Sequence, residues 1–347
     1  MNIDILDCTL RDGGYQNAWD FSGPLVTRYL RALDKTGCRY VEMGYRACAT
    51  DSLAGRYRYS PDHLLRSHGA GLRLKVAVMI DGKTMCNASG MPDLARLETL
   101  FCLRDHSPVH MVRIAATAEM AGPVSTICGW LKDRSYVVAI NLMQASTLEP
   151  RSIRQAAATL DRSGADFVYL ADSFGGLTPD ATIMKIAALA SSFRGRVGFH
   201  AHDNMGLAFA NTLAAIGAGA TIVDSSVLGM GRGAGNLRTE QLLAYLEKTG
   251  CSDIAAAPLF ELLATDFAAL QSQYGWGPSL PYLVTGIHDI HPTYAQTLLR
   301  DPRAAAVDSV RTLESLSHNP FRTTFNAATL EAATNHRSAA SRRLGSA

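Results

Sequence analysis

The chain has 347 residues, of which 47% are hydrophobic and 18% are charged, and its formal net charge is +2. This length allows one large domain or two ordinary ones, and the small net charge without a basic run gives no reason to expect nucleic-acid binding. No apolar stretch is long enough to cross a bilayer, so no membrane partner is expected. The first residues lack the features of a secretory signal, and the seven cysteines are scattered without a CxxC pair, which favours a cytoplasmic location.

Eight short apolar runs predict β-strands, and helical periodicity fills most of the intervals between them. In chain order the predicted strands cover 3–10, 40–44, 74–80, 109–115, 136–143, 167–171, 197–200 and 222–227. The predicted helices cover 24–35, 92–104, 123–132, 152–163, 179–192 and 206–219. The strand runs are rich in Val, Ile and Ala without strict alternation, which is typical of strands buried on both faces of a parallel sheet.

This alternation predicts an α/β protein with a (β/α)8 TIM barrel over residues 1–247. An open dinucleotide-binding sheet is less consistent with it, because the turn after the first strand reads Arg-Asp-Gly-Gly-Tyr and not GxGxxG. Residues 248–334 predict a helical C-terminal extension that covers the barrel mouth or makes a subunit contact. Its apolar stripe over 258–274 favours a homo-oligomer, and the tail 335–347, rich in Ser, Ala and Arg, is expected to be disordered.

Polar side chains gather where the predicted strands end. The active site of a (β/α)8 barrel lies at the carboxyl ends of the strands, so these side chains are expected to share one rim. Each of them alone is more often a cap or a turn residue, but a barrel stabilised only by packing has no need for the whole set. They are Arg11, Asp12, Glu42, Asp81, Arg113, Asn141, Gln144, Asp172, Ser173, His200, His202 and Asp224.

His200 and His202 form the main candidate metal-binding pattern. Residues two apart on a strand share a face, so both imidazoles can bind one divalent cation; two histidines satisfied by other partners are the alternative. Strands one and seven lie close together in a closed barrel, which brings Asp12 near the pair, and Asn236 follows strand eight. Asp12 could instead be a turn residue and Asn236 a helix N-cap. Two imidazoles, one carboxylate and one amide suit Mn2+, the first choice, or Mg2+, Co2+ or Zn2+.

Several residues near this group are predicted to act on a substrate. Arg11 is expected to stabilise an oxyanion, or else to form an ion pair across the rim. The glycine-rich loop 229–235 has two interpretations: its N–H groups and Arg232 bind an anion, or its glycines only let Asn236 approach the cation. Ser173 and the turn after it are predicted to hold a carboxylate. The full set of predicted substrate-binding residues is Ser173, Arg113, Arg232 and Tyr282.

Three motifs resemble those of a superfamily of metal-dependent lyases and synthases built on a TIM barrel. They are LDCTLRDG at 6–13, HAH at 200–202 and GAGN at 233–236. That superfamily includes 3-hydroxy-3-methylglutaryl-CoA lyase, 2-isopropylmalate and homocitrate synthases, and 4-hydroxy-2-oxovalerate aldolase. The aldolase family is the most similar, through HDNMGLAFAN at 202–211 and VDSSVLGMGRGAGN at 223–236.

The resemblance implies that Asp12, His200 and His202 bind the metal, with Asn236 as a fourth ligand. It also implies that Arg11 stabilises an enolate and that Ser173 contacts the carboxylate of a keto acid. Two departures concern proton transfer: Tyr15 stands where the aldolases have a histidine general base, and Gly14 stands where the synthases have a glutamate. The sequence therefore leaves three candidates for the proton-transfer group: Tyr15, a water molecule bound to the cation, and Tyr282. The glycine-rich loop lacks the cysteine of the CoA lyase, which counts against a lyase of that kind.

The predicted activity is that of a divalent-metal-dependent class II aldolase, a carbon–carbon lyase. A 2-oxo acid, pyruvate or a related compound, would chelate the cation, and its C–C bond to an aldehyde would break or form. A Claisen-type synthase that joins an acyl-CoA to a 2-oxo acid is the first alternative, and a non-catalytic barrel subunit is the second. The C-terminal part does not match the segment by which the aldolases dock an aldehyde dehydrogenase, so that partner is without support.

Overall fold

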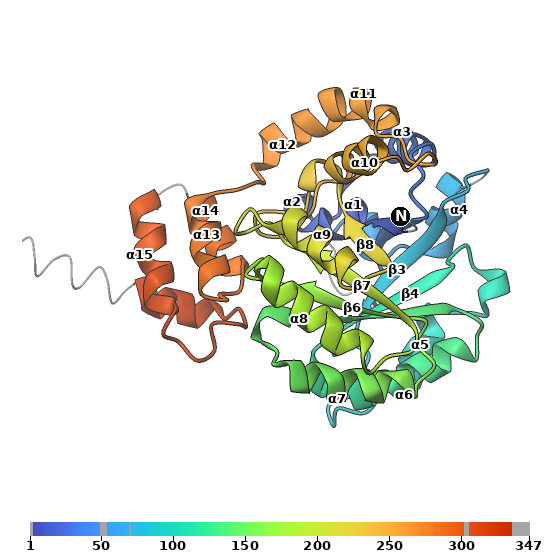
Figure 1. Cartoon of the computed structure of the whole chain (residues 1–347), viewed down its shortest axis with the longest axis horizontal. Helices are drawn as coiled ribbons and strands as arrows, with labels where there is room; N and C mark the ends of the chain where they lie inside the picture. Colours follow the sequence, from blue (N-terminus) through green and yellow to red (C-terminus); the bar gives the residue numbers. More distant parts are fainter. Residues whose placement is uncertain (1–2, 49–53, 70, 302–304, 335–347) are drawn as a thin grey trace, which may run out of the picture.

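The computed structural model describes residues 3–48, 54–69, 71–301 and 305–334. Within these residues, eight parallel strands form a closed barrel in which each strand pairs with the next along the chain and β8 pairs with β1 (Figure 1). The predicted (β/α)8 barrel is confirmed. The strands are β1 (Asp4–Asp7), β2 (Tyr40–Tyr45), β3 (Lys75–Asp81), β4 (Met111–Ala116), β5 (Val137–Leu142), β6 (Phe167–Asp172), β7 (Arg196–Ala201) and β8 (Ile222–Ser225).

Helices follow the strands and cover the outside of the barrel. They are α3 (Gly23–Leu33), α4 (Asp62–Gly69), α5 (Leu94–Leu100), α6 (Ala121–Lys132), α7 (Pro150–Asp161), α8 (Pro179–Ala190), α9 (Ala208–Gly217) and α10 (Thr239–Lys248). Proline stands in the first turn of α3, α7 and α8, where its missing N–H costs no hydrogen bond. The side chains of Ser22 and Thr178 cap α3 and α8 by accepting an N–H of the first turn.

The first strand is shorter than the sequence pattern predicts. β1 ends at Asp7 because its carboxylate accepts hydrogen bonds from the N–H and the hydroxyl of Thr9, at 2.9 and 2.5 Å, which turns the backbone. Arg11 and Asp12 therefore lie on a helical turn over the barrel mouth and not on a strand. The two short helices of this segment are α1 (Thr9–Asp12) and α2 (Gly14–Asn17).

The strands are buried on both faces. Their outward side chains pack under the helices, and their inward side chains fill the barrel with a separate apolar cluster that contains Tyr40, Met111 and Ile222. Residues two apart on a strand share a face. Two residues closer to the mouth, the same inward positions are therefore occupied by charged side chains, namely Glu42, Arg113 and Asp224.

An irregular helical stretch follows the barrel and packs against its outside. The rings of Tyr29 and Phe267 lie 6.2 Å apart, and Arg28 forms an ion pair with Asp266. Part of the apolar stripe over 258–274 is thus covered by α3 of the same chain, while Phe260 and Tyr274 of the stripe are exposed, and the predicted subunit contact stays a prediction. This stretch consists of α11 (Phe260–Leu262), a π-helical turn (Leu263–Phe267) and α12 (Ala268–Tyr274).

The last helices form a group of their own at the barrel mouth, drawn in orange and red in Figure 1. They are α13 (Leu280–Ile287), α14 (Thr293–Arg300) and α15 (Ala306–Leu316), and their apolar cluster contains Tyr282, Tyr294 and Leu313. This is the predicted helical extension. The predicted disordered tail, 335–347, lies outside the described residues. In the part of the chain that the structure describes, no helix combines the length and the apolar character needed to span a bilayer.

Candidate active site

Three of the predicted metal ligands converge at the mouth of the barrel. Asp12 lies on α1, and His200 and His202 lie at the end of β7, which only β8 separates from β1. The Oδ2 atom of Asp12 is 3.9 Å from Nε2 of His200 and 3.9 Å from Nε2 of His202. All three side chains are buried. Residues remote in the sequence therefore present one carboxylate and two imidazoles to the same point.

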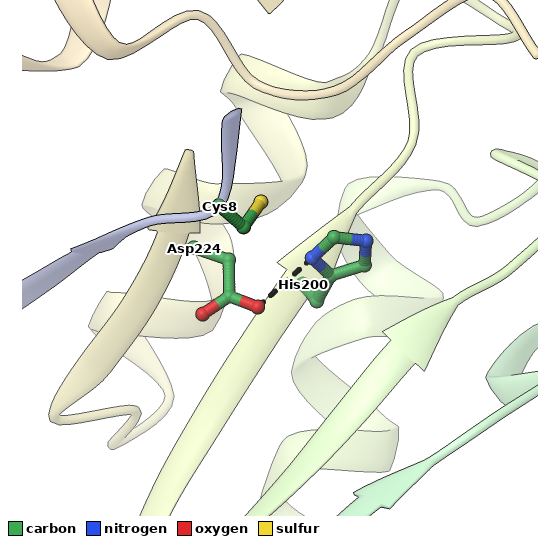
Figure 2. A group of neighbouring side chains, drawn as sticks. All are labelled: Cys8, His200 and Asp224. Atoms are coloured by element: carbon green, nitrogen blue, oxygen red, sulfur yellow. Dashed lines mark hydrogen bonds and ion pairs between the residues drawn. The ribbon is translucent and has the colours of Figure 1, made fainter. Parts of the chain in front are cut away.

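The second nitrogen of each imidazole has its own partner. His200 Nδ1 lies 2.9 Å from Asp224 Oδ2 (Figure 2), and His202 Nδ1 lies 3.2 Å from the carbonyl oxygen of Arg232. Because a carboxylate and a carbonyl only accept hydrogen bonds, each ring donates from Nδ1 and keeps its lone pair on Nε2. The two lone pairs thus lie on the side of Asp12.

The surrounding charges favour an ionised Asp12 and a neutral His202. Burial alone would raise the pKa of Asp12, but Arg11 beside it, together with the two histidines, holds that pKa well below its usual range. Burial lowers the pKa of His202 to about 3. Near neutral pH, Asp12 is therefore an anionic oxygen donor and His202 a lone-pair nitrogen donor, which are the forms that divalent cations bind.

Asn236 lies beside this group. Its Nδ2 donates to Asp12 Oδ2 at 2.7 Å, and its backbone pairs with that of His202. Its Oδ1 is buried and has no hydrogen-bond partner among the described residues. Leaving a buried amide oxygen unpaired is costly. Rotation of the amide would exchange its oxygen and nitrogen and bring the oxygen to the side of Asp12, where a cation would satisfy it.

These donors fit a divalent cation. Two atoms that each lie about 2.1 Å from one ion are at most about 4.2 Å apart. The 3.9 Å separations between Asp12 and the two histidines fall within that limit. Imidazole nitrogen with carboxylate and amide oxygen is a donor set that suits Mn2+, Mg2+, Co2+ or Zn2+.

A second cluster of potential ligands lies on the other side of His200. Cys8, His200 and Asp224 are also close enough to hold an ion, and Figure 2 shows the carboxylate and the thiol near the Nδ1 side of the ring. Burial raises the pKa of the Cys8 thiol well above its usual value, and its Sγ donates to the carbonyl oxygen of Ser225 at 3.2 Å. The thiolate and not the thiol binds metals, so this cluster is less suited to hold an ion. Its Asp224 instead orients the ring of His200 through the hydrogen bond at Nδ1.

Arg11 is fixed beside Asp12. Its Nε donates to Glu42 Oε2 at 2.7 Å and its Nη1 donates to Asp12 Oδ1 at 2.6 Å. The indole N–H of Trp19 donates to the carbonyl oxygen of Arg11 at 2.8 Å, which holds the backbone. A guanidinium fixed in this way next to a cation site can share negative charge that develops there without reorganising.

The structure does not place Arg113 on the cavity wall. Its guanidinium lies in the barrel interior and donates to Glu42 at 2.9 Å and to Asp224 at 2.5 Å, with the ring of Tyr169 4.5 Å away. Burial alone would lower the pKa of Arg113, but Asp224 and Glu42 keep it above its usual value. Two carboxylates occupy this arginine. Its guanidinium links Glu42, which also pairs with Arg11, to Asp224, which also pairs with His200, and it does not line the cavity.

The metal-ligand group opens into a cavity of about 240 Å³. Tyr15, Ser173 and Arg232 line this cavity, and Tyr282 does not. The buried face of α13 carries Tyr282 into the apolar cluster of the extension, where burial raises its pKa to about 12. Besides the residues already described, the cavity is lined by Tyr45, Met79, Asp81, Ala115, Asn141, Met143, Gln144, Ala171, Phe174 and His291.

Ser173 and Arg232 form one wall of this cavity. Ser173 Oγ accepts the backbone N–H of Gln144 at 2.8 Å, and Nη2 of Arg232 donates to the carbonyl oxygen of Ser173 at 3.4 Å. The Nε of Arg232 is buried without a hydrogen-bond partner in the described part of the chain. A guanidinium with spare donors beside a serine hydroxyl suits a carboxylate.

The glycines of the loop 229–235 are required by close packing. A Cβ on Gly231 would lie 2.5 Å from Nδ2 of Asn236, and a Cβ on Gly235 would lie 2.0 Å from the carbonyl oxygen of Gly229. Gly235 also has a φ of +95°, a conformation that favours glycine. The glycines therefore let Asn236 approach Asp12, while Arg232 of the same loop lines the cavity.

The cavity wall also contains residues that the sequence does not single out. Tyr45, Met79 and Ala115 stand on β2, β3 and β4, but apolar side chains at such positions look like core. Strand-end position is the one signal that points to them. His291 lies in the extension, remote from any strand, and only the packing of α13 and α14 on the barrel brings it to the cavity.

The chain is similar to known proteins over most of its length. The model of the HMGL-like family matches residues 80–265. The chain belongs to the HMGL-like family. A 4-hydroxy-2-oxovalerate aldolase from Geobacillus genomosp. 3 is 33% identical, over 72% of this chain and 71% of that protein. The 4-hydroxy-2-oxovalerate aldolase of Pelotomaculum thermopropionicum is 34% identical over the same shares. The resemblance read from the motifs is confirmed.

Solved structures extend the similarity to the fold. The N-terminal domain of a proposed aldolase from Bacteroides vulgatus superposes with a TM-score of 0.78 at 30% identity, over 86% of this chain and 97% of that one. The carboxyl transferase domain of Rhizobium etli pyruvate carboxylase gives a TM-score of 0.71 at 16% identity, over 97% of this chain and 60% of that one. The second likeness concerns the fold alone, and it includes the helical extension of this HMGL-like protein.

Proposed function

We propose that this protein is a divalent-metal-dependent class II aldolase that cleaves or forms a C–C bond between a 2-oxo acid, pyruvate or a related compound, and an aldehyde. The observation that carries the proposal is the convergence of Asp12, His200 and His202, with both Nε2 lone pairs free, beside Arg11 at one cavity. The relatives named 4-hydroxy-2-oxovalerate aldolase support the same reaction type.

The cation is held by Asp12, His200 and His202, with Asn236 at a fourth position. Mn2+ is the proposed ion, and Mg2+, Co2+ or Zn2+ suit the same donors. When bound, the ion supplies a Lewis acid that lowers the cost of negative charge on the 2-oxo oxygen of the substrate.

The protein side chains then have separate tasks. Arg11 shares the charge that develops on that oxygen, since its guanidinium is already fixed beside Asp12. Ser173 and Arg232 hold the carboxylate of the 2-oxo acid, because they provide a hydroxyl and spare N–H donors on one wall. Both tasks use residues predicted from the sequence.

Proton transfer is assigned to Tyr15. In cleavage, the phenolate form of Tyr15 takes the proton of the 4-hydroxyl of a 4-hydroxy-2-oxo acid, the C3–C4 bond breaks with its electron pair remaining on C3 as an enolate, and Tyr15 then returns the proton to C3. Tyr15 lines the cavity, and its hydroxyl lies 2.9 Å from that of Tyr45, so the two hydroxyl groups form a hydrogen bond on the cavity wall. Tyr282, the other tyrosine considered, does not reach the cavity.

A Claisen-type synthase is less consistent with the site. A Cβ on Gly14 would lie 2.1 Å from Cδ1 of Trp19, so the glutamate that the synthases carry has no room at this position. A non-catalytic barrel is also less consistent, because such a protein has no need for oriented imidazoles around a buried carboxylate.

Other properties follow as proposals. The proposed division is a barrel (1–247) and an extension (248–334): the last helices have their own apolar cluster around Tyr282 and Tyr294, while Leu259, Phe267 and Trp276 pack with the barrel core. A cytoplasmic location agrees with the seven cysteines, all of which lie in the described residues and are free thiols. For a homo-oligomer, exposed Leu280, Leu283 and Ile287 on α13 are a candidate contact. An aldehyde dehydrogenase partner has no support in these features.

A direct test uses purified protein loaded with Mn2+ and a series of 4-hydroxy-2-oxo acids of increasing chain length. We expect release of equal amounts of a 2-oxo acid and an aldehyde, measured by coupled reductions. Absence of both products from every compound would contradict the proposal. Release of free CoA from an acyl-CoA and a 2-oxo acid, without any aldehyde, would favour the synthase instead.

A further inference from the structure

His291 reaches the cavity from the helical extension. It precedes α14, and its side chain lines the same cavity as Arg11, Asp12 and Tyr15. None of the tasks assigned above uses it. An imidazole on the wall of a reaction cavity is able to donate or accept a hydrogen bond, so its orientation decides what it can do.

The extension that carries His291 is attached to the loops of the barrel mouth. Asn204, after β7, donates to Thr285 Oγ1 of α13 at 2.9 Å. Gln144, after β5, donates to the carbonyl oxygen of Thr323 at 3.3 Å. On α14, Gln296 donates to the carbonyl oxygen of Tyr15 at 3.4 Å. Because these contacts involve three separate loops of the barrel, the position of the extension over the cavity is fixed.

The ring of His291 is oriented by its own neighbours. Its Nδ1 accepts the backbone N–H of Thr293 at 3.3 Å, and its backbone N–H donates to the carbonyl oxygen of Arg322 at 2.8 Å. With Nδ1 acting as acceptor, a neutral ring carries its hydrogen on Nε2. Nε2 makes no hydrogen bond to any residue that the structure describes. Burial, together with Arg232, lowers the pKa of His291 to about 3, so the ring is neutral near neutral pH.

The direction of substrate entry limits which oxygen this donor meets. Arg11 and the residues that would hold the cation lie at the ends of the strands and would fix the 2-oxo acid there, so the aldehyde has to arrive from the mouth, which the extension covers. The donors nearer the strands already have tasks: Arg11 is assigned to the 2-oxo oxygen, and Ser173 and Arg232 are assigned to the carboxylate. His291 is therefore placed to meet the part of the substrate that faces the extension.

We infer that His291 is a substrate-contacting residue whose Nε2–H donates a hydrogen bond to the oxygen on C4, which is the carbonyl oxygen of the aldehyde in the synthetic direction. The inference rests on the proposed aldolase function. When C3 attacks the aldehyde, the C=O electron pair moves onto this oxygen, and a donor held in place stabilises the resulting alkoxide before it takes its proton from Tyr15. In cleavage the same contact stabilises the alkoxide from which the C3–C4 bond breaks.

The experiment compares His291→Ala and His291→Gln with His288→Gln, a matched change in the same extension that does not line the cavity. Two rates are measured on Mg2+-loaded protein: cleavage of a 4-hydroxy-2-oxo acid, and exchange of the C3 protons of pyruvate with D2O by NMR. Exchange requires enolate formation but no aldehyde, so it does not involve the C4 oxygen. The metal content of each variant is measured as well.

We expect His291→Ala to lower kcat for cleavage by about 100-fold, the effect of losing one oxyanion donor. Its C3 exchange and metal content should stay at the wild-type level. His291→Gln keeps an N–H donor and should recover part of the cleavage rate, and His288→Gln should behave as the wild type.

Three results would overturn the role of His291. They are cleavage by His291→Ala at the wild-type rate, a loss of exchange as large as the loss of cleavage, and a loss of metal. The second result would assign His291 to proton removal at C3, and the third would make it structural. If the wild-type protein itself neither cleaved nor exchanged, the proposed function would fall, and this inference with it.

Discussion

The two ends of the barrel contain charged side chains in contrasting states. At the amino-terminal ends of the strands, Asp4 is paired with Arg39 at 3.2 Å and with Arg196 at 2.5 Å. Arg196 also donates to the carbonyl oxygen of Thr221 at 2.7 Å. Here each charged group has found partners within the protein, and the arginines are about half exposed to solvent, so this end needs no ligand.

At the carboxyl ends of the strands, buried polar atoms remain without partners. Oδ1 of Asn236, Oδ1 of Asn141 and Nε of Arg232 make no hydrogen bonds to the described residues. The Nε2 lone pairs of His200 and His202 meet only a carboxylate oxygen 3.9 Å away. Since unpaired buried polar groups are costly, they persist where a ligand satisfies them. The comparison teaches that this end of the barrel is built to bind, and the other to be stable.

The largest effect is expected for Asp12→Asn. Removing the anionic oxygen should abolish metal retention, measured by elemental analysis after gel filtration, and should lower kcat by about 1000-fold or more, because the Lewis acid is lost. Asp4→Asn, the same change at the opposite end, serves as the control and should retain both metal and turnover. Turnover by Asp12→Asn at the wild-type rate would remove the metal from the reaction.

Arg11→Lys should have the next largest effect. Lysine keeps the charge but cannot donate to Glu42 and Asp12 in the fixed planar geometry of a guanidinium, so charge on the substrate is less well stabilised. We expect kcat to fall by about 100-fold with metal content unchanged. Arg39→Lys at the other end is the control and should leave kcat as it is. A change of less than threefold in Arg11→Lys would show that Arg11 only supports the fold.

Asp224→Asn tests the hydrogen bond that orients His200. Asparagine accepts more weakly from His200 Nδ1, so the lone pair on Nε2 is less firmly directed at the metal site. The affinity for Mn2+, measured by titration calorimetry, should fall by about 10- to 100-fold. Asp166→Asn, which removes a carboxylate paired with Lys132 away from the mouth, is the control. Equal Mn2+ affinity in wild type and Asp224→Asn would contradict this role.

At the amino-terminal end, Asp4→Asn should affect stability alone. Its arginine partners are largely solvated, so the free energy of unfolding should fall by about 1 kcal/mol or less, and less still at high salt. Urea unfolding at low and high ionic strength measures this. A loss of kcat in Asp4→Asn would show that the two ends are not independent.

A pH dependence of stability is also expected at the same end. Burial lowers the pKa of His110 from 6.5 to about 4. Between these values the unfolded chain binds more protons than the folded one, so the contribution of His110 to stability is present above pH 6.5 and is lost as the pH falls toward 4. His110→Gln should show a shallower decline of the melting temperature over this range than the wild type. An identical decline in both proteins would contradict the shift.

The sequence predicts the barrel well because its signals are local. Apolar runs and helical periodicity locate the strands and most helices to within a few residues, and strand order follows from the alternation. The first strand is predicted too long, because the hydrogen bonds of Thr9 to Asp7 that end it depend on a side chain that reads as ordinary strand sequence.

The site is predictable where it depends on strand ends and not where it depends on packing. Asp12, His200 and His202 come together at the barrel mouth because the two histidines lie at the end of β7 and Asp12 lies on the helical turn after β1. Arg113 stands on a strand as well, but its two carboxylate partners turn it into the interior. Tyr282 and His291 belong to the extension, whose docking no local pattern reveals, so the sequence selects the tyrosine while the structure brings the histidine to the cavity.

One measurement tests the metal site most directly: anomalous diffraction from crystals soaked in Mn2+. The predicted result is a single strong peak within about 2.3 Å of Asp12 Oδ2 and of the Nε2 atoms of His200 and His202. A peak between Cys8, His200 and Asp224 instead, or no peak at the barrel mouth at saturating Mn2+, would contradict the assignment.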